Sequence, residues 1–334
     1  MIRRVCFLAL VLTCALPIAR AQGNTPLRLL QTIPLPNVHG RIDHFDADLN
    51  GGRLFMSALG NNTLEVFDLH SNQVIHTIQG LKEPQGVTYV PKSNRIFVAN
   101  GGDGTCRMFD GSTYKILKTV RLSSDADDTR YDPATNQVLV GYGDETSAGL
   151  AFLDGTTGEL VGSIKLPDHP ESFQLEENGP QIYVNIPSAK NIVAVVDRSA
   201  RKIVATWTLG GARDNFPMAL DEGNHRLFVS CRAPAEVLVL DTESGQILAR
   251  IASVTHADDA WYDAANKRAY VTGGGGFITV IEQQDANHYR RLAQFKTADG
   301  ARTSYLLPQL DRLYLGVWGQ GGKPEELRIY GIER

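Results

Sequence analysis

The segments ADDTRYDPATNQVLV (126–140) and ADDAWYDAANKRAYV (257–271) show the same pattern at two places that lie 131 residues apart. Each begins with an acidic doublet, passes through a tyrosine and an aspartate into a turn that contains asparagine, and ends in a short apolar run. Asn and Asp favour tight turns, and runs of β-branched or aromatic residues favour strands. A turn and strand that recur in this way indicate a repeat protein, whose period decides the fold.

Five further copies of the apolar strand complete the repeat, with spacings of 42 to 45 residues. The seven copies lie, in chain order, at 54–56, 96–98, 138–140, 182–184, 227–229, 269–271 and 313–315. The second unit contains four short β-like runs, GVTYV, RIFVAN, CRMFD and KILKTVRL, each bounded by turn-forming residues. Four strands in each unit of about 40 residues are typical of a propeller blade. The expected fold class is all-β, a seven-bladed β-propeller of four-stranded blades.

The two ends of the chain predict how the ring closes. The seventh unit supplies only three strands and finishes at ELRIYGI (326–332), whereas LRLLQTIPL (27–35) resembles the fourth strands of the other units. We therefore expect the N-terminal strand to complete the last blade, because this pairing leaves no open sheet edge.

Residues 1–21 have the features of a secretory signal peptide: a basic start, an apolar stretch and small residues around Ala21. Residues 22–334 are then expected to form a single propeller domain that is periplasmic or secreted. No second apolar run approaches the length of a membrane span.

The mature chain is acidic. Three of the 33 basic residues lie in the leader, so 30 remain against 37 acidic residues, which gives a net charge of −7. Nucleic acid is therefore a disfavoured partner, since phosphate binding needs clustered Lys and Arg. Cys106 and Cys231 fall at different points of the repeat, so a disulfide between them is not favoured. We expect a monomer that binds a small molecule or a partner protein.

Several strand ends resemble a known family. RIFVANGG, QIYVNIPSAKN and RAYVTGGGG are similar to the Tyr-Val-Thr-Asn repeat of the YVTN, or YncE-like, β-propeller family. The resemblance covers the whole mature chain through short, degenerate motifs, and it implies an exported seven-bladed propeller in the quinoprotein-like superfamily. It implies little about chemistry, because function belongs to the site and not to a widely used fold. Single-stranded DNA binding is associated with the family, but the acidity of this chain disfavours it.

The first strand of each unit should line the central tunnel, and its opening residues are polar. The column of the first doublet aspartates reads Asp43, Gln85, Asp127, Glu171, Phe216, Asp258 and Arg302. Two positions earlier stand Arg41, Glu83, Asp125, His169, Asp214, His256 and Gly300. Later residues of these strands are apolar, so the polar side chains should gather at one tunnel mouth. The predicted ligand-binding ring consists of Arg41, Asp43, His44, Gln85, Asp127, Asp128, Arg130, Glu171, Asp214, Asp258, Asp259 and Arg302.

Two interpretations of the ring stay open. In the first, it is a hydrated mouth without a function, whose acids are solvated or paired to Arg41, Arg130, Arg213 and Arg302. In the second, it binds a ligand or a cation, because converging carboxylates either take up protons or attract a hard cation such as Ca²⁺. The candidate metal ligands are the doublets, Asp127, Asp128, Asp258 and Asp259. A Zn²⁺ site built on His44 and His256 is less favoured, since the usual closely spaced helical motif is absent.

The favoured function is a binding module, and the alternative is a metal-dependent, calcium-type hydrolase such as a lactonase. A quinone-cofactor dehydrogenase is suggested by the superfamily alone, and it is disfavoured because the tryptophan that normally docks between the blades is missing. The chain has no Gly-x-Ser-x-Gly elbow and no Cys–His pair aligned by the repeat, so the sequence predicts no particular catalytic residue.

Overall fold

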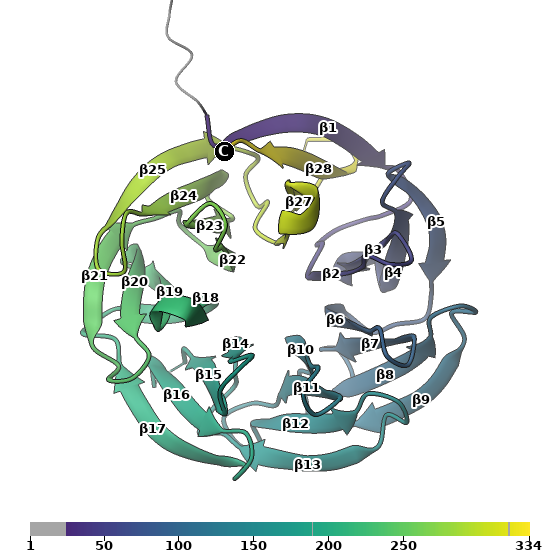
Figure 1. Cartoon of the computed structure of the whole chain (residues 1–334). Coiled ribbons are helices and arrows are strands. Elements are labelled where there is room, and N and C mark those ends of the chain that lie inside the picture. The colour runs from purple at the N-terminus through teal and green to yellow at the C-terminus, as the bar shows by residue number, and fades with distance from the viewer. Residues whose placement is uncertain (1–24, 189, 320) are drawn as a thin grey trace, which may run out of the picture.

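The computed structural model describes residues 25–188, 190–319 and 321–334. Within these ranges the strands form seven antiparallel four-stranded sheets, arranged around a central axis as the blades of a propeller (Figure 1). The predicted all-β, seven-bladed fold is confirmed. The predicted signal peptide (1–21) lies outside the described residues.

The first six blades are meanders of four consecutive strands. Blade one consists of β2 (Phe45–Asp48), β3 (Arg53–Ala58), β4 (Thr63–Asp68) and β5 (Gln73–Ile78). Blade two consists of β6 (Pro84–Val90), β7 (Arg95–Asn100), β8 (Thr105–Asp110) and β9 (Ile116–Arg121). Blade three consists of β10 (Thr129–Asp132), β11 (Gln137–Tyr142), β12 (Gly149–Asp154) and β13 (Leu160–Lys165).

The second half of the ring repeats the arrangement. Blade four consists of β14 (Ser172–Leu175), β15 (Gln181–Ile186), β16 (Ile192–Asp197) and β17 (Lys202–Thr208). Blade five consists of β18 (Arg213–Asp221), β19 (Arg226–Ala233), β20 (Ala235–Asp241) and β21 (Ile247–Ala252). Blade six consists of β22 (Ala257–Asp263), β23 (Arg268–Gly273), β24 (Phe277–Gln283) and β25 (Tyr289–Lys296).

Blade seven joins the two ends of the chain. It consists of β26 (Ser304–Leu307), β27 (Arg312–Val317), β28 (Glu325–Ile332) and β1 (Leu27–Leu35). Strand β1 runs antiparallel to β28, with Leu27 opposite Ile332 and Leu35 opposite Glu325. In Figure 1 the purple N-terminal strand lies on the outside of the yellow C-terminal strand. The expected closure by the N-terminal strand is therefore present.

Helices contribute almost nothing to the described ranges. The helical segments there are three 3-10 turns, Leu59–Asn61 (η1), Glu222–Asn224 (η2) and Pro308–Leu310 (η3). None of the helices in these ranges has the length and apolar character needed to cross a bilayer.

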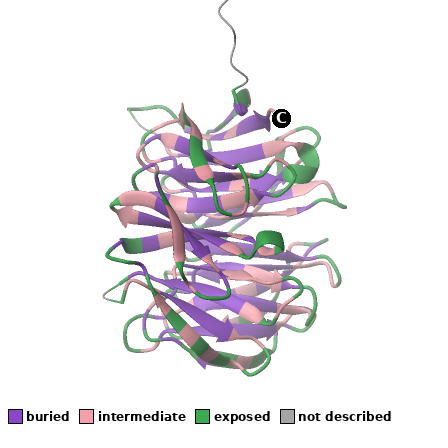
Figure 2. Cartoon of the chain, turned by 60° about the vertical axis from the view of Figure 1, so that its left-hand side comes forward, coloured by how far each residue is buried: buried purple, intermediate pink, exposed green. Residues whose placement is uncertain are grey.

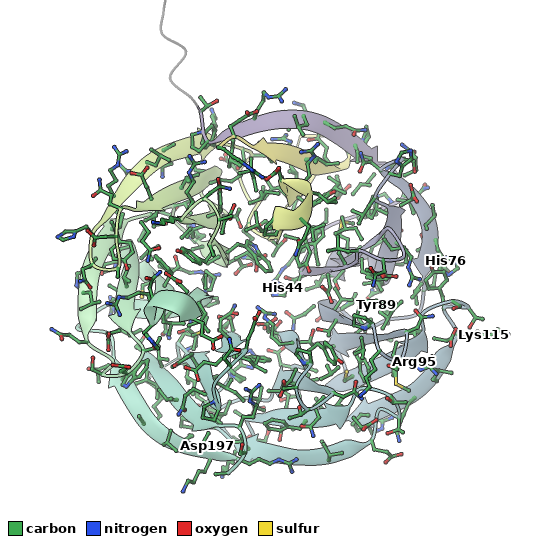
Figure 3. All side chains as sticks on the ribbon, in the orientation of Figure 1. His44, His76, Tyr89, Arg95, Lys115 and Asp197 are labelled. Carbon is green, nitrogen blue, oxygen red and sulfur yellow. The ribbon has the colours of Figure 1, made fainter. Side chains whose placement is uncertain are left out.

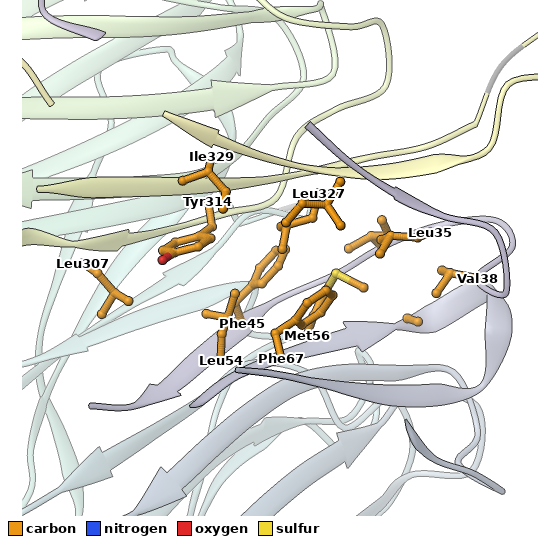
Figure 4. Close-up of a cluster of buried hydrophobic side chains, with 13 residues drawn as sticks. Leu35, Val38, Phe45, Leu54, Met56, Phe67, Leu307, Tyr314, Leu327 and Ile329 are labelled. Carbon is orange, nitrogen blue, oxygen red and sulfur yellow. The ribbon is translucent and has the colours of Figure 1, made fainter. Parts of the chain in front are cut away.

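The core lies between neighbouring blades. Second strands such as β3 are buried for almost their whole length, whereas the outer strand β17 alternates between exposed and half-buried residues. Figure 2 shows the same gradient, with buried residues within the stacked sheets and exposed residues on loops and outer strands. Figure 4 shows the cluster between blades seven and one, where Phe45 and Met56 pack with Tyr314 and Leu327. This packing on both faces of each sheet fixes the first strands around the tunnel.

Candidate functional site

The residues that open the first strands converge at one mouth of the tunnel. Asp43, Asp127, Glu171 and Asp258 come from four different blades, yet each lies close enough to another to affect its ionisation. Figure 3 places His44 near the axis of the ring. The first polar column of the sequence is thus a ring in space.

Backbone conformation decides which residues of the earlier column face the ring. Glu83, Asp125, Asp214, His256 and Gly300 all have positive φ, and the four non-glycine residues among them are exposed. The predicted site residue Asp214 therefore lies at the exposed rim, as Glu83 and His256 do, whereas the side chain of Asp125 still reaches Gln85 and His169. The two remaining positions of the column do not have positive φ, and their side chains point inward.

These two inward residues are Arg41 and His169. The sequence predicted a site role for Arg41, but His169 was only one member of a mixed column. The repeat does not predict whether the backbone at this position has an ordinary or a left-handed conformation, because the conformation depends on the loop that precedes each first strand. The direction of these side chains was therefore not predictable from the sequence.

One half of the ring is rich in arginine. Asp258 forms ion pairs with Nε of Arg302 (2.6 Å), with Nη2 of Arg232 and, at 3.9 Å, with Nη2 of Arg41. The guanidinium group of Arg232 lies 3.2 Å from the ring centroid of Phe216, and that of Arg302 lies 5.3 Å from the ring of Trp318. We call Arg41, Arg232, Arg302 and Asp258 the arginine cluster.

The arginine cluster carries more positive than negative charge. Burial, with smaller contributions from Arg302 and Arg41, lowers the pKa of Arg232 below its ordinary value. Asp43 is fully buried 2.9 Å from Arg41, and burial raises the pKa of its carboxyl to about 6. The sequence did not predict Arg232 as a member of the site. Arg232 lies near the end of β19, the second strand of blade five, and in the sequence it indicated only a polar residue beside a loop.

The opposite half of the ring is acidic. Asp127, His169 and Glu171, which we call the Asp–His–Glu cluster, place one potential ligand atom each within 4.8 Å of one another. His169 Nε2 lies 3.6 Å from Asp127 Oδ2, and Nδ1 donates a hydrogen bond to the Gly143 carbonyl oxygen (2.6 Å). Among the described residues, this is the group of His, Cys, Asp and Glu side chains with spacing suitable for a metal ion.

Burial and mutual repulsion shift the ionisation of this cluster. Burial and the charge of Asp127 raise the pKa of Glu171 to about 8. Burial alone would lower the pKa of His169, but the hydrogen bond and charge of Asp127 outweigh it and raise this pKa to about 9. The pKa of Asp127 is lowered, since its interactions with His169 and His44 outweigh burial.

The second aspartates of the doublets have other partners. Asp128 Oδ1 accepts hydrogen bonds from Arg130 and from the Thr129 N–H. Asp259 Oδ2 accepts the Ser304 N–H (2.7 Å), and its Oδ1 lies 3.3 Å from His44 Nδ1. Each doublet lies at an irregularity of the pairing, since Asp127 and Asp128 both bond to Gly141 and β22 shifts register between Ala257 and Asp259. The two aspartates of each doublet therefore meet different partners.

The four aspartates predicted as metal ligands therefore face separate partners. Asp258 lies among arginines, Asp128 is paired to Arg130, Asp259 lies beside His44, and Asp127 belongs to the Asp–His–Glu cluster. The predicted calcium site built from all four stays a prediction.

Gln85 completes the ring on the second blade. Its Nε2 donates a hydrogen bond to Asp125 Oδ1 (2.8 Å). A side chain at Gly101 would meet this amide, because a Cβ there would lie 2.3 Å from Gln85 Nε2. The glycine-rich loop thus leaves room for the amide at the mouth.

A hollow of about 740 Å³ lies at the opposite end of the tunnel, beside the ends of β14 and β18. Two of the carboxylates that line it, those of Glu222 and Glu176, already have partners in the fold. Glu222 accepts the backbone N–H groups of Glu177 and Asn178, and Glu176 accepts the Tyr183 hydroxyl. These contacts give both acidic residues a role in holding the fold together. The ring at the tunnel mouth is therefore a stronger candidate for a functional site than this hollow.

Comparisons with known proteins place the chain among propellers. No protein-family model matches it. It is 27% identical over 179 residues to the protein described as "Uncharacterized protein YncE" in Salmonella typhi, and equally to that of Salmonella typhimurium strain LT2. Each match covers 52% of this chain and 49% of the relative, so the chain spans about half the length of the curated relatives it matches.

Solved structures agree on the fold. A chain of Kuenenia stuttgartiensis hydrazine synthase superposes with a TM-score of 0.74 at 14% identity, covering 89% of this chain and 95% of that one. A chain in the crystal structure of the mitotic checkpoint complex gives a TM-score of 0.77 at 12% identity, covering 99% of both. Similarity at this level of identity shows the fold alone.

The seven blades and the polar mouth define a class first: the chain is a seven-bladed β-propeller with a ring of polar residues at one mouth of its tunnel. Its sequence similarity to the YncE proteins then narrows the class. The chain is a seven-bladed β-propeller that is similar in sequence, over about half of its length, to the YncE proteins.

Proposed function

We propose that the chain is an exported binding module that takes a small, carboxylate-bearing ligand at the tunnel-mouth ring. The observation that carries this proposal is the arginine cluster, in which Arg232, Arg302 and, at 3.9 Å, Arg41 lie around the carboxylate of Asp258. Arg41 also pairs with Asp43 at 2.9 Å. Each guanidinium has five N–H donors in a planar fork, so these two carboxylates do not use all the donors of three arginines. A further carboxylate, supplied by a ligand, suits this geometry and charge.

The surroundings of the cluster favour a small ligand. Phe216 and Trp318 lie against the guanidinium groups of Arg232 and Arg302, which limits the rotation of both arginines and presents apolar surface beside them. The ionised carboxylate of Asp127, across the mouth, repels a second anionic group. A ligand with one carboxylate and a neutral or cationic polar group fits both halves of the ring.

The test uses thermal unfolding and titration calorimetry with acetate, lactate, succinate and glycine as probes. Because a ligand that binds only the folded state stabilises it, at least one probe should raise the melting temperature of the wild-type chain. Arg232→Ala should weaken that binding about tenfold or more. Arg290→Ala, on the outer strand β25, is the matched control and should bind as the wild type does.

Two results would reject this function. One is a flat melting temperature across the whole probe series. The other is equal affinity of the Arg232→Ala and Arg290→Ala variants. Capture of a partner protein through the same mouth, without any small-molecule binding, would replace the ligand by a protein and would also reject the proposal.

Export is part of the proposal, because the signal-like segment precedes the described residues. Expression of the full chain with a C-terminal tag, followed by fractionation and N-terminal sequencing, tests it. We expect the product in the periplasm or the medium, starting at Gln22. An intact Met1 terminus on cytoplasmic protein would contradict export.

A metal-dependent hydrolase, such as a lactonase, is the second candidate function, and the spacing of the Asp–His–Glu cluster is what favours it. A bound divalent cation would polarise a carbonyl and make water a better nucleophile. Asp127, His169 and Glu171 would hold it, and the arginine cluster would orient an acidic substrate. A lactone panel assayed with added Zn²⁺, Mn²⁺ or Ca²⁺ tests this candidate, and flat progress curves would reject it.

A further inference from the structure

We propose that Asp127, His169 and Glu171 form a binding site for one first-row divalent cation, Zn²⁺ or Mn²⁺, in preference to Ca²⁺. This site lies in the acidic half of the ring and differs from the four-aspartate set that the sequence suggested. The proposal goes beyond the ligand site at the arginine cluster, since it holds whether or not a carboxylate binds there.

The backbone brings the three ligands together from two neighbouring blades. Asp127 precedes β10 in blade three, and His169 and Glu171 precede β14 in blade four. His169 and Glu171 are two residues apart, with Pro170 between them, directly before the start of β14. The potential ligand atoms of all three residues lie within 4.8 Å of one another.

His169 is held as a metal ligand usually is. Its Nδ1 is the donor in the hydrogen bond to the Gly143 carbonyl, because a carbonyl oxygen only accepts. This bond directs Nε2 toward Asp127, 3.6 Å away. Histidine ligands commonly donate the other ring N–H to such a carbonyl, which fixes the ring and its tautomer.

Gly143 itself is required for this arrangement. Its φ is +99°, and a Cβ there would lie 2.5 Å from the Ser147 carbonyl oxygen and 2.6 Å from the Cα of Ala148. Its N–H donates to the Ser124 carbonyl oxygen at 2.8 Å. The carbonyl that orients His169 is therefore held by a tight loop that excludes other residues.

Asp127 supplies an independent indication of a missing partner. The residue is only 7% exposed, and its Oδ1 atom has no hydrogen-bond partner among the described residues. Its backbone is fixed, because its N–H donates to the Gly141 carbonyl oxygen (2.9 Å). A buried carboxylate oxygen without a protein donor is unfavourable, and a cation at the cluster would satisfy it.

The donor set selects the kind of cation. Calcium takes six to eight oxygen ligands, whereas this cluster offers two carboxylates and one imidazole nitrogen. Imidazole suits Zn²⁺ and the other first-row cations, and carboxylates suit Mn²⁺ as well. Three protein ligands leave open coordination positions, as in zinc sites that also bind a substrate or water.

The test uses the exported chain without a polyhistidine tag, stripped of metal by a chelator. Calorimetry with ZnCl₂ should show one equivalent bound, and the electron paramagnetic resonance signal of MnCl₂ should decrease with the same stoichiometry. His169→Ala and Glu171→Gln should each weaken binding at least about tenfold. His256→Ala is the matched control, because His256 has the same place in blade six but is exposed, and it should bind like the wild type.

A further measurement keeps the result independent of variant folding. The X-ray absorption spectrum of the zinc-loaded wild-type chain should show one imidazole among oxygen ligands. Absence of stoichiometric Zn²⁺ and Mn²⁺ uptake, a spectrum without imidazole, tighter binding of Ca²⁺ than of both ions, or equal losses in His169→Ala and His256→Ala would each overturn the proposal. Metal uptake without any response to carboxylates would reject only the proposed ligand function.

Discussion

At the scale of single residues, side-chain direction determines what each member of the acidic doublets does. The repeat predicted that Asp127 and Asp258 open tunnel-lining strands, and both lie in the ring. Their different environments depend on neighbours in adjacent blades, His169 for one and Arg232 for the other. A repeat alignment compares equivalent positions within blades, so it does not predict contacts between non-equivalent positions of two blades.

The ionisation of Glu171 and His169 predicts that stability falls with rising pH. Both pKa values, about 8 and about 9, are raised in the folded chain, so the folded chain binds more protons than the unfolded one. The Glu171 contribution declines as pH rises from about 4.5 to 8, and the His169 contribution is complete below about 6.5 and lost through about 9. Urea unfolding with chelator should therefore show a free energy of unfolding that falls by about 2 to 4 kcal/mol between pH 6 and 9.

The variant Glu171→Gln separates the two contributions. It should remove the Glu171 part of the decline, which ends near pH 8, and leave the His169 part between about pH 6.5 and 9. Glu177→Gln, on an exposed loop at the other end of the tunnel, should keep the wild-type slope. If the free energy of unfolding of Glu171→Gln changed with pH as steeply as that of the wild type, Glu171 would not hold its proton in the folded chain.

At the scale of elements, strand β1 illustrates what patterning predicts well. Leu27, Ile33 and Leu35 are buried on it, while Leu29 is 49% exposed, and the strand pairs with β28 as the incomplete seventh unit required. The left-handed kinks before the first strands were not predictable in the same way. Asp125, Asp214 and His256 adopt positive φ although their side chains do not require it.

Substitutions on β1 should have contrasting effects. Leu35→Ala leaves a cavity in the cluster formed with Val38 and Leu327, so we expect the free energy of unfolding to fall by about 2 to 4 kcal/mol. Leu29→Ala, on the exposed face of the same strand, should change it by less than about 0.5 kcal/mol. Denaturant melts at neutral pH measure both. Similar losses from the two variants would mean that β1 is not packed as described.

At the scale of the whole molecule, each apolar cluster joins two neighbouring blades, and the ring of blades has no free end. Cys106 lies in the cluster between blades two and three, and Cys231 lies in the cluster between blades four and five. Both are free and buried, and burial raises the pKa of each thiol to about 12. Each cysteine therefore reports on the opening of a different part of the ring.

We expect the two thiols to become reactive together. In native protein neither Cys106 nor Cys231 should react with a thiol reagent, and in rising urea both should be labelled at the same midpoint, because opening one interface of a closed ring exposes the next. Mass spectrometry of labelled peptides gives the two midpoints separately. Clearly different midpoints would show that the two halves of the ring unfold independently.

The pairing of β1 with β28 also orders events during synthesis. Arg28 and Glu333, which form an ion pair across this junction, are 305 residues apart. Strand β1 therefore leaves the ribosome long before β28, its partner. A product that stops before Glu325 offers β1 no strand to pair with, and two unpaired sheet edges remain accessible to proteases and to other chains. Closure of the propeller thus distinguishes chains that contain β28 from chains that stop before it.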